Sequence, residues 1–95
     1  MTEQQHEADV VAQIEAELAR LRVSDVLLHT ASTVASLAYR RLADDEQDLD
    51  QVRLAVEALK AIVPLLDGAV PEDVAGDFRQ VIASLQLSYA DAVAR

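Results

Sequence analysis

Apolar residues recur at helical spacing along most of this 95-residue chain, and the pattern divides the chain into four segments. The clearest repeat follows residue 48, where apolar side chains return every three or four positions: Leu49, Val52, Val56, Leu59, Val63 and Leu66. Asp48 suits the N-cap of this helix, and Gln51 stands where its capping-box partner belongs. Pro64 removes a backbone donor inside the pattern, so the spacing predicts a helix that ends or kinks near Val63.

A second repeat predicts a C-terminal helix over about 72–93. Asp67 and Gly68 mark the break before it, and Pro71 suits the first helical position. Its apolar residues are Val74, Phe78, Val81, Ile82, Leu85, Tyr89 and Ala92. Phe78 is the only phenylalanine in the chain, and we expect it to anchor this helix to the core.

The central segment 26–39 has no formally charged residue, although the net charge of the chain is −9. Its apolar residues fall around the whole helical circumference, which predicts a helix buried on every side. Ser24 and Asp25 offer an N-cap and a first-turn acid. Ala31 and Ala35 lie one turn apart and form a small patch that another helix can approach closely. The segment is shorter than the about 20 apolar residues that cross a bilayer, so we expect no membrane span.

The first 22 residues carry a separate apolar stripe with spacings of 3, 4 and 3: Val11, Ile14, Leu18 and Leu21. This spacing is typical of a coiled-coil seam but covers only about two heptads. We expect residues 1–9 to be frayed and a helix to cover about 10–22. The helix either folds back as a fourth bundle member or pairs with its copy in a second chain. We favour a dimer, because closed two-fold dimers are the commonest soluble assemblies.

Together these segments predict an all-α fold: a small up-and-down bundle of three main helices over 23–95, preceded by an accessory N-terminal helix over 1–22. The net charge of −9 opposes binding to nucleic-acid phosphate or to an anionic membrane. The acidic run that begins with Asp44, Asp45 and Glu46 is either a solvated loop or a docking surface for a basic partner. The polar first ten residues do not resemble a secretory signal, so we expect a cytoplasmic protein.

Catalytic and metal-binding patterns are weak in this sequence. Glu3 and His6 form a Glu-x-x-His pair, but carboxylate-bridged metal sites in bundles need that pair twice. His29 is interpreted as a core or interface histidine whose role stays open. The chain has no cysteine and only two glycines, so it offers neither a thiol nucleophile nor a phosphate-binding glycine loop. We expect no enzyme, no cofactor and no metal.

Three stretches resemble a family of small helical proteins of actinobacteria and their relatives that is classified as a domain of unknown function. They are DVLLHTASTVASLAYRRL (25–42), DEQDLDQVRLAVEALKAIVPLL (45–66) and VIASLQLSYADA (81–92). The resemblance covers about 23–93 and implies packing residues rather than catalytic ones. The genes of this family often lie near those for translation initiation factor three and ribosomal proteins, which implies a translation-linked role.

The sequence therefore favours a non-catalytic helical interaction module that associates with itself. Two alternatives stay open. One is an acidic adaptor that docks a basic partner, for which the resemblance implies a ribosomal or translational setting. The other is a small metal-binding protein that uses Glu3, His6 and the acidic clusters.

Overall fold

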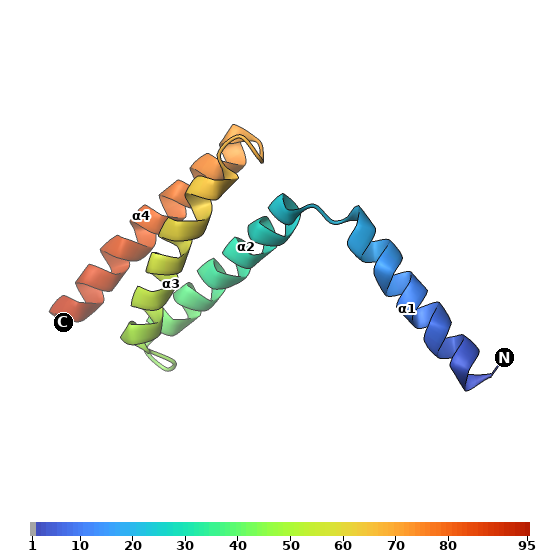
Figure 1. The fold of residues 1–95 in the computed structure, drawn as a ribbon. Coiled ribbons are helices and arrows are strands. Elements are labelled where there is room, and N and C mark those ends of the chain that lie inside the picture. The colour runs from blue at the N-terminus through green and yellow to red at the C-terminus, as the bar shows by residue number, and fades with distance from the viewer. Residues whose placement is uncertain (1) are drawn as a thin grey trace.

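The computed structural model describes residues 2–95, and within them it contains four α-helices, one short 3-10 helix and no strand (Figure 1). The predicted all-α fold is confirmed. The elements are α1 (Glu3–Arg20), α2 (Val23–Leu42), α3 (Leu49–Ile62), the 3-10 helix η1 (Val63–Leu66) and α4 (Glu72–Ala94).

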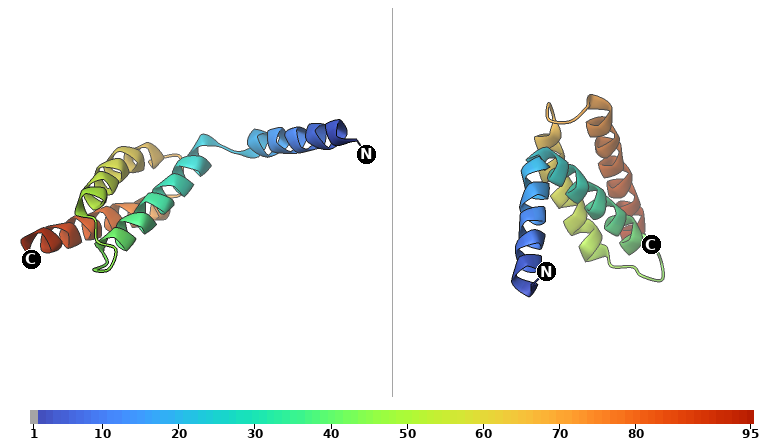
Figure 2. Two further views of the ribbon diagram at one scale, coloured as in Figure 1. Left: turned by 90° about the horizontal axis from the view of Figure 1, so that it is seen from below. Right: turned by 90° about the vertical axis from the view of Figure 1, so that its right-hand side faces the viewer.

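Helices α2, α3 and α4 pack against one another in up-and-down order and enclose one hydrophobic core (Figures 1 and 2). Helix α2 contributes mainly alanines to this core, whereas α3, η1 and α4 contribute larger side chains. The buried cluster consists of Ala31, Ala35, Ala38, Val56, Leu59, Val63 and Leu85. Phe78 is only partly buried and packs at the edge of this cluster, so it is one of several side chains that fix α4 rather than its single anchor.

The ends of α3 follow the sequence prediction. The Asp48 side chain accepts a hydrogen bond from the backbone N–H of Gln51 (3.3 Å), so Asp48 is the N-cap. Helix α3 ends at Ile62, and Pro64 lies within the tighter turn of η1. Gly68 then takes a φ of 78°, a left-handed conformation that glycine adopts without steric cost, and the chain reverses into α4. Pro71 precedes α4 as its N-cap instead of occupying the first helical position.

One arginine ties the turn before α4 to the body of that helix. The Arg79 guanidinium donates to Asp67 Oδ1 (2.9 Å) and to Glu72 Oε1. These two carboxylates raise the pKa of the Arg79 guanidinium above its ordinary value, and the hydrogen bond that Arg79 donates to Glu72 is the largest cause. All three side chains are exposed to solvent, so the contact orients the turn and stabilises the fold only weakly.

The prediction that α2 is buried on every side was wrong. Its buried residues are Ala31, Ala35 and Ala38 alone, while Val26 and Tyr39 are exposed. A bundle of three helices covers only the inward face of each member, so the apolar residues elsewhere on α2 remain at the surface. Its start also differs from the prediction: α2 begins at Val23, and the Asp25 carboxylate accepts from the backbone N–H of the N-cap residue Arg22 (3.2 Å), which is one half of a capping box.

Helix α1 stands apart from the bundle. It begins at Glu3 because Thr2 caps it, with the Thr2 hydroxyl accepting from the Gln5 N–H (3.2 Å), so the expectation of a frayed segment over 1–9 was wrong for the described residues. Within residues 2–95, α1 packs against none of the other helices, and it projects away from them in Figures 1 and 2. The radius of gyration is 18.2 Å, whereas a compact chain of this length has about 12 Å.

Candidate interaction surfaces

The apolar stripe of α1 is open to solvent along its whole length. Ile14 is 51% exposed and Leu18 is 61% exposed, and no residue of α1 is buried. The sequence placed Val11, Ile14, Leu18 and Leu21 at a candidate interface. The structure places the first three on α1 and Leu21 at its C-cap, and all four are exposed. Within residues 2–95, α1 touches no other element. Monomeric proteins rarely expose several large apolar side chains next to one another, so this stripe is unusual for a monomer.

The direction of α1 is set by the two residues that join it to α2. Leu21 and Arg22 are both extended, with ψ angles of 135° and 149°. A backbone hydrogen bond caps the helix on each side of this link. The Leu21 N–H donates to the Leu18 carbonyl oxygen (3.2 Å), and the Asp25 N–H donates to the Arg22 carbonyl oxygen (3.0 Å). With this extended link, α1 and α2 do not form a helical hairpin, and α1 does not pack alongside α2 within residues 2–95.

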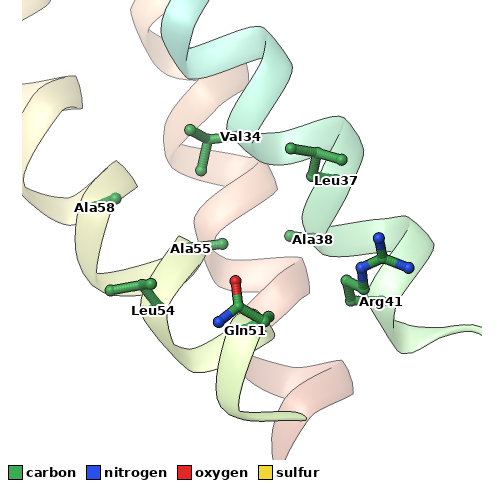
Figure 3. A pocket seen from close by; sticks show the side chains of 8 residues that line it. All are labelled: Val34, Leu37, Ala38, Arg41, Gln51, Leu54, Ala55 and Ala58. Atoms are coloured by element: carbon green, nitrogen blue, oxygen red, sulfur yellow. The ribbon is translucent and has the colours of Figure 1, made fainter. Parts of the chain in front are cut away.

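A second apolar surface lies in the groove between α2 and α3 (Figure 3). Four side chains of each helix line it: Val34, Leu37, Ala38 and Arg41 from α2, and Gln51, Leu54, Ala55 and Ala58 from α3. Leu37 is 49% exposed and Leu54 is 61% exposed, so the rims of the groove are apolar and open. Arg41 and Gln51 supply its polar groups, and they come from the ends of α2 and α3 next to the 43–48 loop.

Helical spacing continues the α2 side of the groove toward the start of that helix. Arg41, Leu37 and Val34 lie on one flank of α2, and Thr30, Val26 and Val23 extend the same flank at spacings of three or four residues. Val23 and Val26 are exposed. The Thr30 hydroxyl donates to the Val26 carbonyl oxygen (2.8 Å), so it is already hydrogen-bonded within the helix. The flank thus has an apolar character over nearly the full length of α2.

Sequence reasoning missed Leu37 and Leu54 as surface residues. Leu37 was assigned to a helix buried on every side. Leu54 lies off the repeat that predicts the buried face of α3, and an apolar residue off that repeat was the available signal for a second contact surface.

Ala31 and Ala35 do not lie on a free surface. Both are buried in the core cluster, where they face residues of α3, η1 and α4. The sequence correctly indicated that another helix approaches α2 at these alanines. That approach occurs within one chain, so the two alanines are not available to a second copy.

Within the described residues, the acidic run of Asp44, Asp45 and Glu46 is engaged in ion pairs at only one of its three residues. Glu46 Oε2 accepts from Arg40 Nε (2.8 Å) and lies 3.7 Å from Arg41 Nη1, so Glu46 neutralises basic side chains of its own chain. Asp44 and Asp45 are exposed, and neither forms an ion pair in the part of the chain that the structure describes. The structure therefore leaves two of the three candidate docking residues open to a basic partner.

The remaining candidates for chemistry lie apart from one another. Glu3 and His6 are exposed on the first turns of α1, and His29 is exposed on α2 rather than held in a core. Between residues 2 and 95, no group of three or more histidine, aspartate or glutamate side chains is placed to hold a metal ion. None of the helices described combines the length and the apolar character that a membrane crossing requires.

In comparisons with known proteins, the sequence matches no family model, no curated protein and no solved structure. The architecture therefore defines the class, an all-α three-helix bundle that carries a projecting helix. The resemblance to the actinobacterial family stays a prediction, and any function has to be argued from the two apolar surfaces and the acidic loop.

Proposed function

We propose that this chain is a non-catalytic assembly module that associates with itself through the apolar stripe of α1. A single observation carries the proposal: Val11, Ile14 and Leu18 of α1 and its C-cap residue Leu21 are all exposed, and α1 contacts no other element of residues 2–95. Most of the stability of a helix in a protein comes from packing of its apolar face rather than from propensity, so α1 gains most of its stability from a surface that covers this stripe. A second chain supplies such a surface.

Light scattering of the full-length chain tests the proposal. At about 100 μM, an association of about 8 kcal/mol gives a dimer, because the corresponding dissociation constant is near 1 μM. We expect the parent to have the mass of a dimer, and a chain without residues 1–22 to have the mass of a monomer. A parent with monomer mass at this concentration would contradict the proposal.

A pair of single variants separates the stripe from the rest of α1. Ile14→Glu places a charge in the stripe, whereas Gln13→Glu makes the same charge change beside it. Both positions are exposed within one chain, so neither variant disturbs the core of the bundle. We expect Ile14→Glu to weaken the dimer strongly and Gln13→Glu to leave it nearly unchanged.

The second candidate function is an acidic adaptor for a basic partner, and the exposure of Asp44 and Asp45 favours it. Salt distinguishes the two functions. Docking between opposite charges weakens as salt rises, because screening shortens the range of the attraction. Two chains with a net charge of −9 repel each other, so an apolar dimer should strengthen when moderate salt is added. The adaptor gains support if Asp44→Asn with Asp45→Asn releases a partner that also dissociates in salt.

A further inference from the structure

We propose that α1 of one chain occupies the α2–α3 groove of a second chain, and that two chains exchange α1 reciprocally in a closed dimer. This inference rests on the proposed self-association and names the surface that receives α1. It joins the two open apolar surfaces of the bundle, the α1 stripe and the groove lined by Leu37 and Leu54. The two surfaces are complementary in shape, because the groove is a concave space between two helices and the stripe is a convex ridge on a single helix.

The two surfaces match in length. Val11 and Leu18 are seven residues apart along α1, and Val34 and Arg41 are seven residues apart along the groove. At about 1.5 Å per residue, each pair spans about 10 Å. Leu21, one turn beyond Leu18, then falls beside Thr30, which lies one turn before Val34 on the same flank of α2.

Charge sets the direction in which α1 enters the groove. Glu7 continues the line of the stripe one turn before Val11, so the N-terminal end of the stripe is acidic. The groove has its only lining cation, Arg41, at the end next to the 43–48 loop. Glu46 engages Arg40 at 2.8 Å but Arg41 at 3.7 Å, so Arg41 keeps hydrogen-bonding capacity for a second carboxylate. The favoured arrangement places Glu7 at the Arg41 end of the groove, one turn beyond Val11, and runs α1 antiparallel to the α2 that receives it.

The link between α1 and α2 favours a second chain over a fold-back in the same chain. For α1 to reach its own groove, the extended Leu21 and Arg22 would have to turn sharply within two residues. That turn would disturb the hydrogen bond from the Arg22 N–H to the Asp25 carboxylate. Exchange between two chains retains the extended link and its caps, and a short link under strain is the usual setting for such an exchange.

Contact area favours exchange over a seam between two α1 helices. Over its full length of 18 residues, α1 presents a strip at most about 27 Å long and about 10 Å wide, which sets an upper bound of about 270 Å² per surface. A single α1–α1 seam joins two such surfaces and covers about 540 Å², whereas reciprocal exchange makes two contacts and covers about 1,100 Å². Stable interfaces bury about 1,200 Å² or more, so only the exchanged dimer approaches the required size.

Disulfide cross-linking tests the exchange directly, because the chain has no cysteine of its own. One chain carries Ile14→Cys in the stripe and another carries Leu54→Cys at the groove. The two are mixed in denaturant, refolded together and oxidised. The Ile14→Cys and Leu54→Cys chains have the same mass, because isoleucine and leucine are isomers. One of the two chains is therefore labelled with heavy nitrogen, and intact-mass spectrometry then distinguishes the mixed disulfide from the two homodimeric products. The matched control replaces the Leu54→Cys chain by Gln80→Cys, an exposed position on α4.

We expect the mixed disulfide between the Ile14→Cys and Leu54→Cys chains as the main cross-linked product, in large excess over the control pair. If the Ile14→Cys chains instead cross-link mainly with one another, the dimer is an α1 seam, and the groove inference fails while self-association stands. If a chain that carries both substitutions closes an internal disulfide as a monomer, α1 folds back, and the inference and the proposed self-association both fail.

A second measurement avoids cysteine chemistry. Leu54→Glu places a charge at the rim of the groove and leaves the core intact, since Leu54 is exposed within the chain. Gln80→Glu makes the same change of charge on α4. We expect Leu54→Glu to shift the mass from dimer to monomer and Gln80→Glu to have no such effect. A Leu54→Glu chain that dimerises as well as the parent overturns the groove as the receiving surface.

Discussion

The hydroxyl of Tyr39 donates a hydrogen bond to Oγ of Ser84 at 3.2 Å and thereby joins α2 to α4 across 45 positions of the sequence. It is the one hydrogen bond between side chains of these two helices among the described residues. Both residues are exposed, and the distance is long for a contact between two hydroxyl groups. The contact links the two helices at this point, but it is weak as a source of stability.

Tyr39→Phe removes the donor and keeps the ring. Because water can replace the lost partner at an exposed site, we expect the free energy of unfolding to fall by about 0.5 kcal/mol, the lower end for a hydrogen bond. Denaturant titration at one fixed protein concentration measures this change, since stability of an associating chain depends on concentration. Ser84→Ala should give a similar loss, and the double variant should lose no more than either single variant. A loss well above 1.5 kcal/mol would show that the pair is buried in solution.

Close packing between α2 and its neighbours depends on small side chains. Ala31 is completely buried in the core cluster, so Ala31→Leu must displace residues of the facing helices. We expect this overpacking to cost about 1–3 kcal/mol, measured by denaturant titration. Ala83→Leu makes the same change on an exposed part of α4 and should stay within about 0.5 kcal/mol of the parent. Equal effects of the two variants would contradict the placement of α2 in the bundle.

Two leucines on α4 provide a matched test of the core. Leu85 is fully buried, whereas Leu87, two residues further along, is 68% exposed. We expect Leu85→Ala to cost about 2–5 kcal/mol because it leaves a cavity in the core, and Leu87→Ala to change stability by less than about 0.5 kcal/mol. Thermal and denaturant unfolding of both variants measure the difference. A larger loss for Leu87→Ala would place the other face of α4 against the bundle.

The sequence predicted the helices better than it predicted their surroundings. The repeat from Leu49 to Leu66 located α3 and η1 because period and caps are local properties, and Asp48 and Pro64 mark the two ends within a few residues. Burial is not local. Leu37 and Val26 are as apolar as core residues, but they lie at the surface since, within residues 2–95, α3 with η1 and α4 cover only one side of α2.

Of the two apolar surfaces, the stripe could be predicted from the sequence and the groove could not. The spacing of Val11, Ile14, Leu18 and Leu21 identified the stripe of α1, because a stripe follows from periodicity alone. The groove could not be predicted, since it forms between Leu37 of α2 and Leu54 of α3 and depends on how these two helices pack. The pairing of Glu46 with Arg40 likewise depends on the path of a loop that no sequence period describes.

The stability of α1 should depend on association. Helix α1 makes no tertiary contact within residues 2–95 and so lacks the packing that supplies most helical stability in proteins, whereas α2, α3 and α4 stabilise one another through a shared core. On dilution from dimer to monomer, the backbone amides of α1 should therefore lose their protection from hydrogen exchange, while those around Leu59 and Leu85 stay protected. Hydrogen exchange read by mass spectrometry at several concentrations, with the mass measured in parallel, provides the test. The chain without residues 1–22 is the control, and its three helices should exchange equally at every concentration. If α1 stays protected in samples that have the mass of a monomer, its stripe is covered within one chain, and self-association is not what stabilises it.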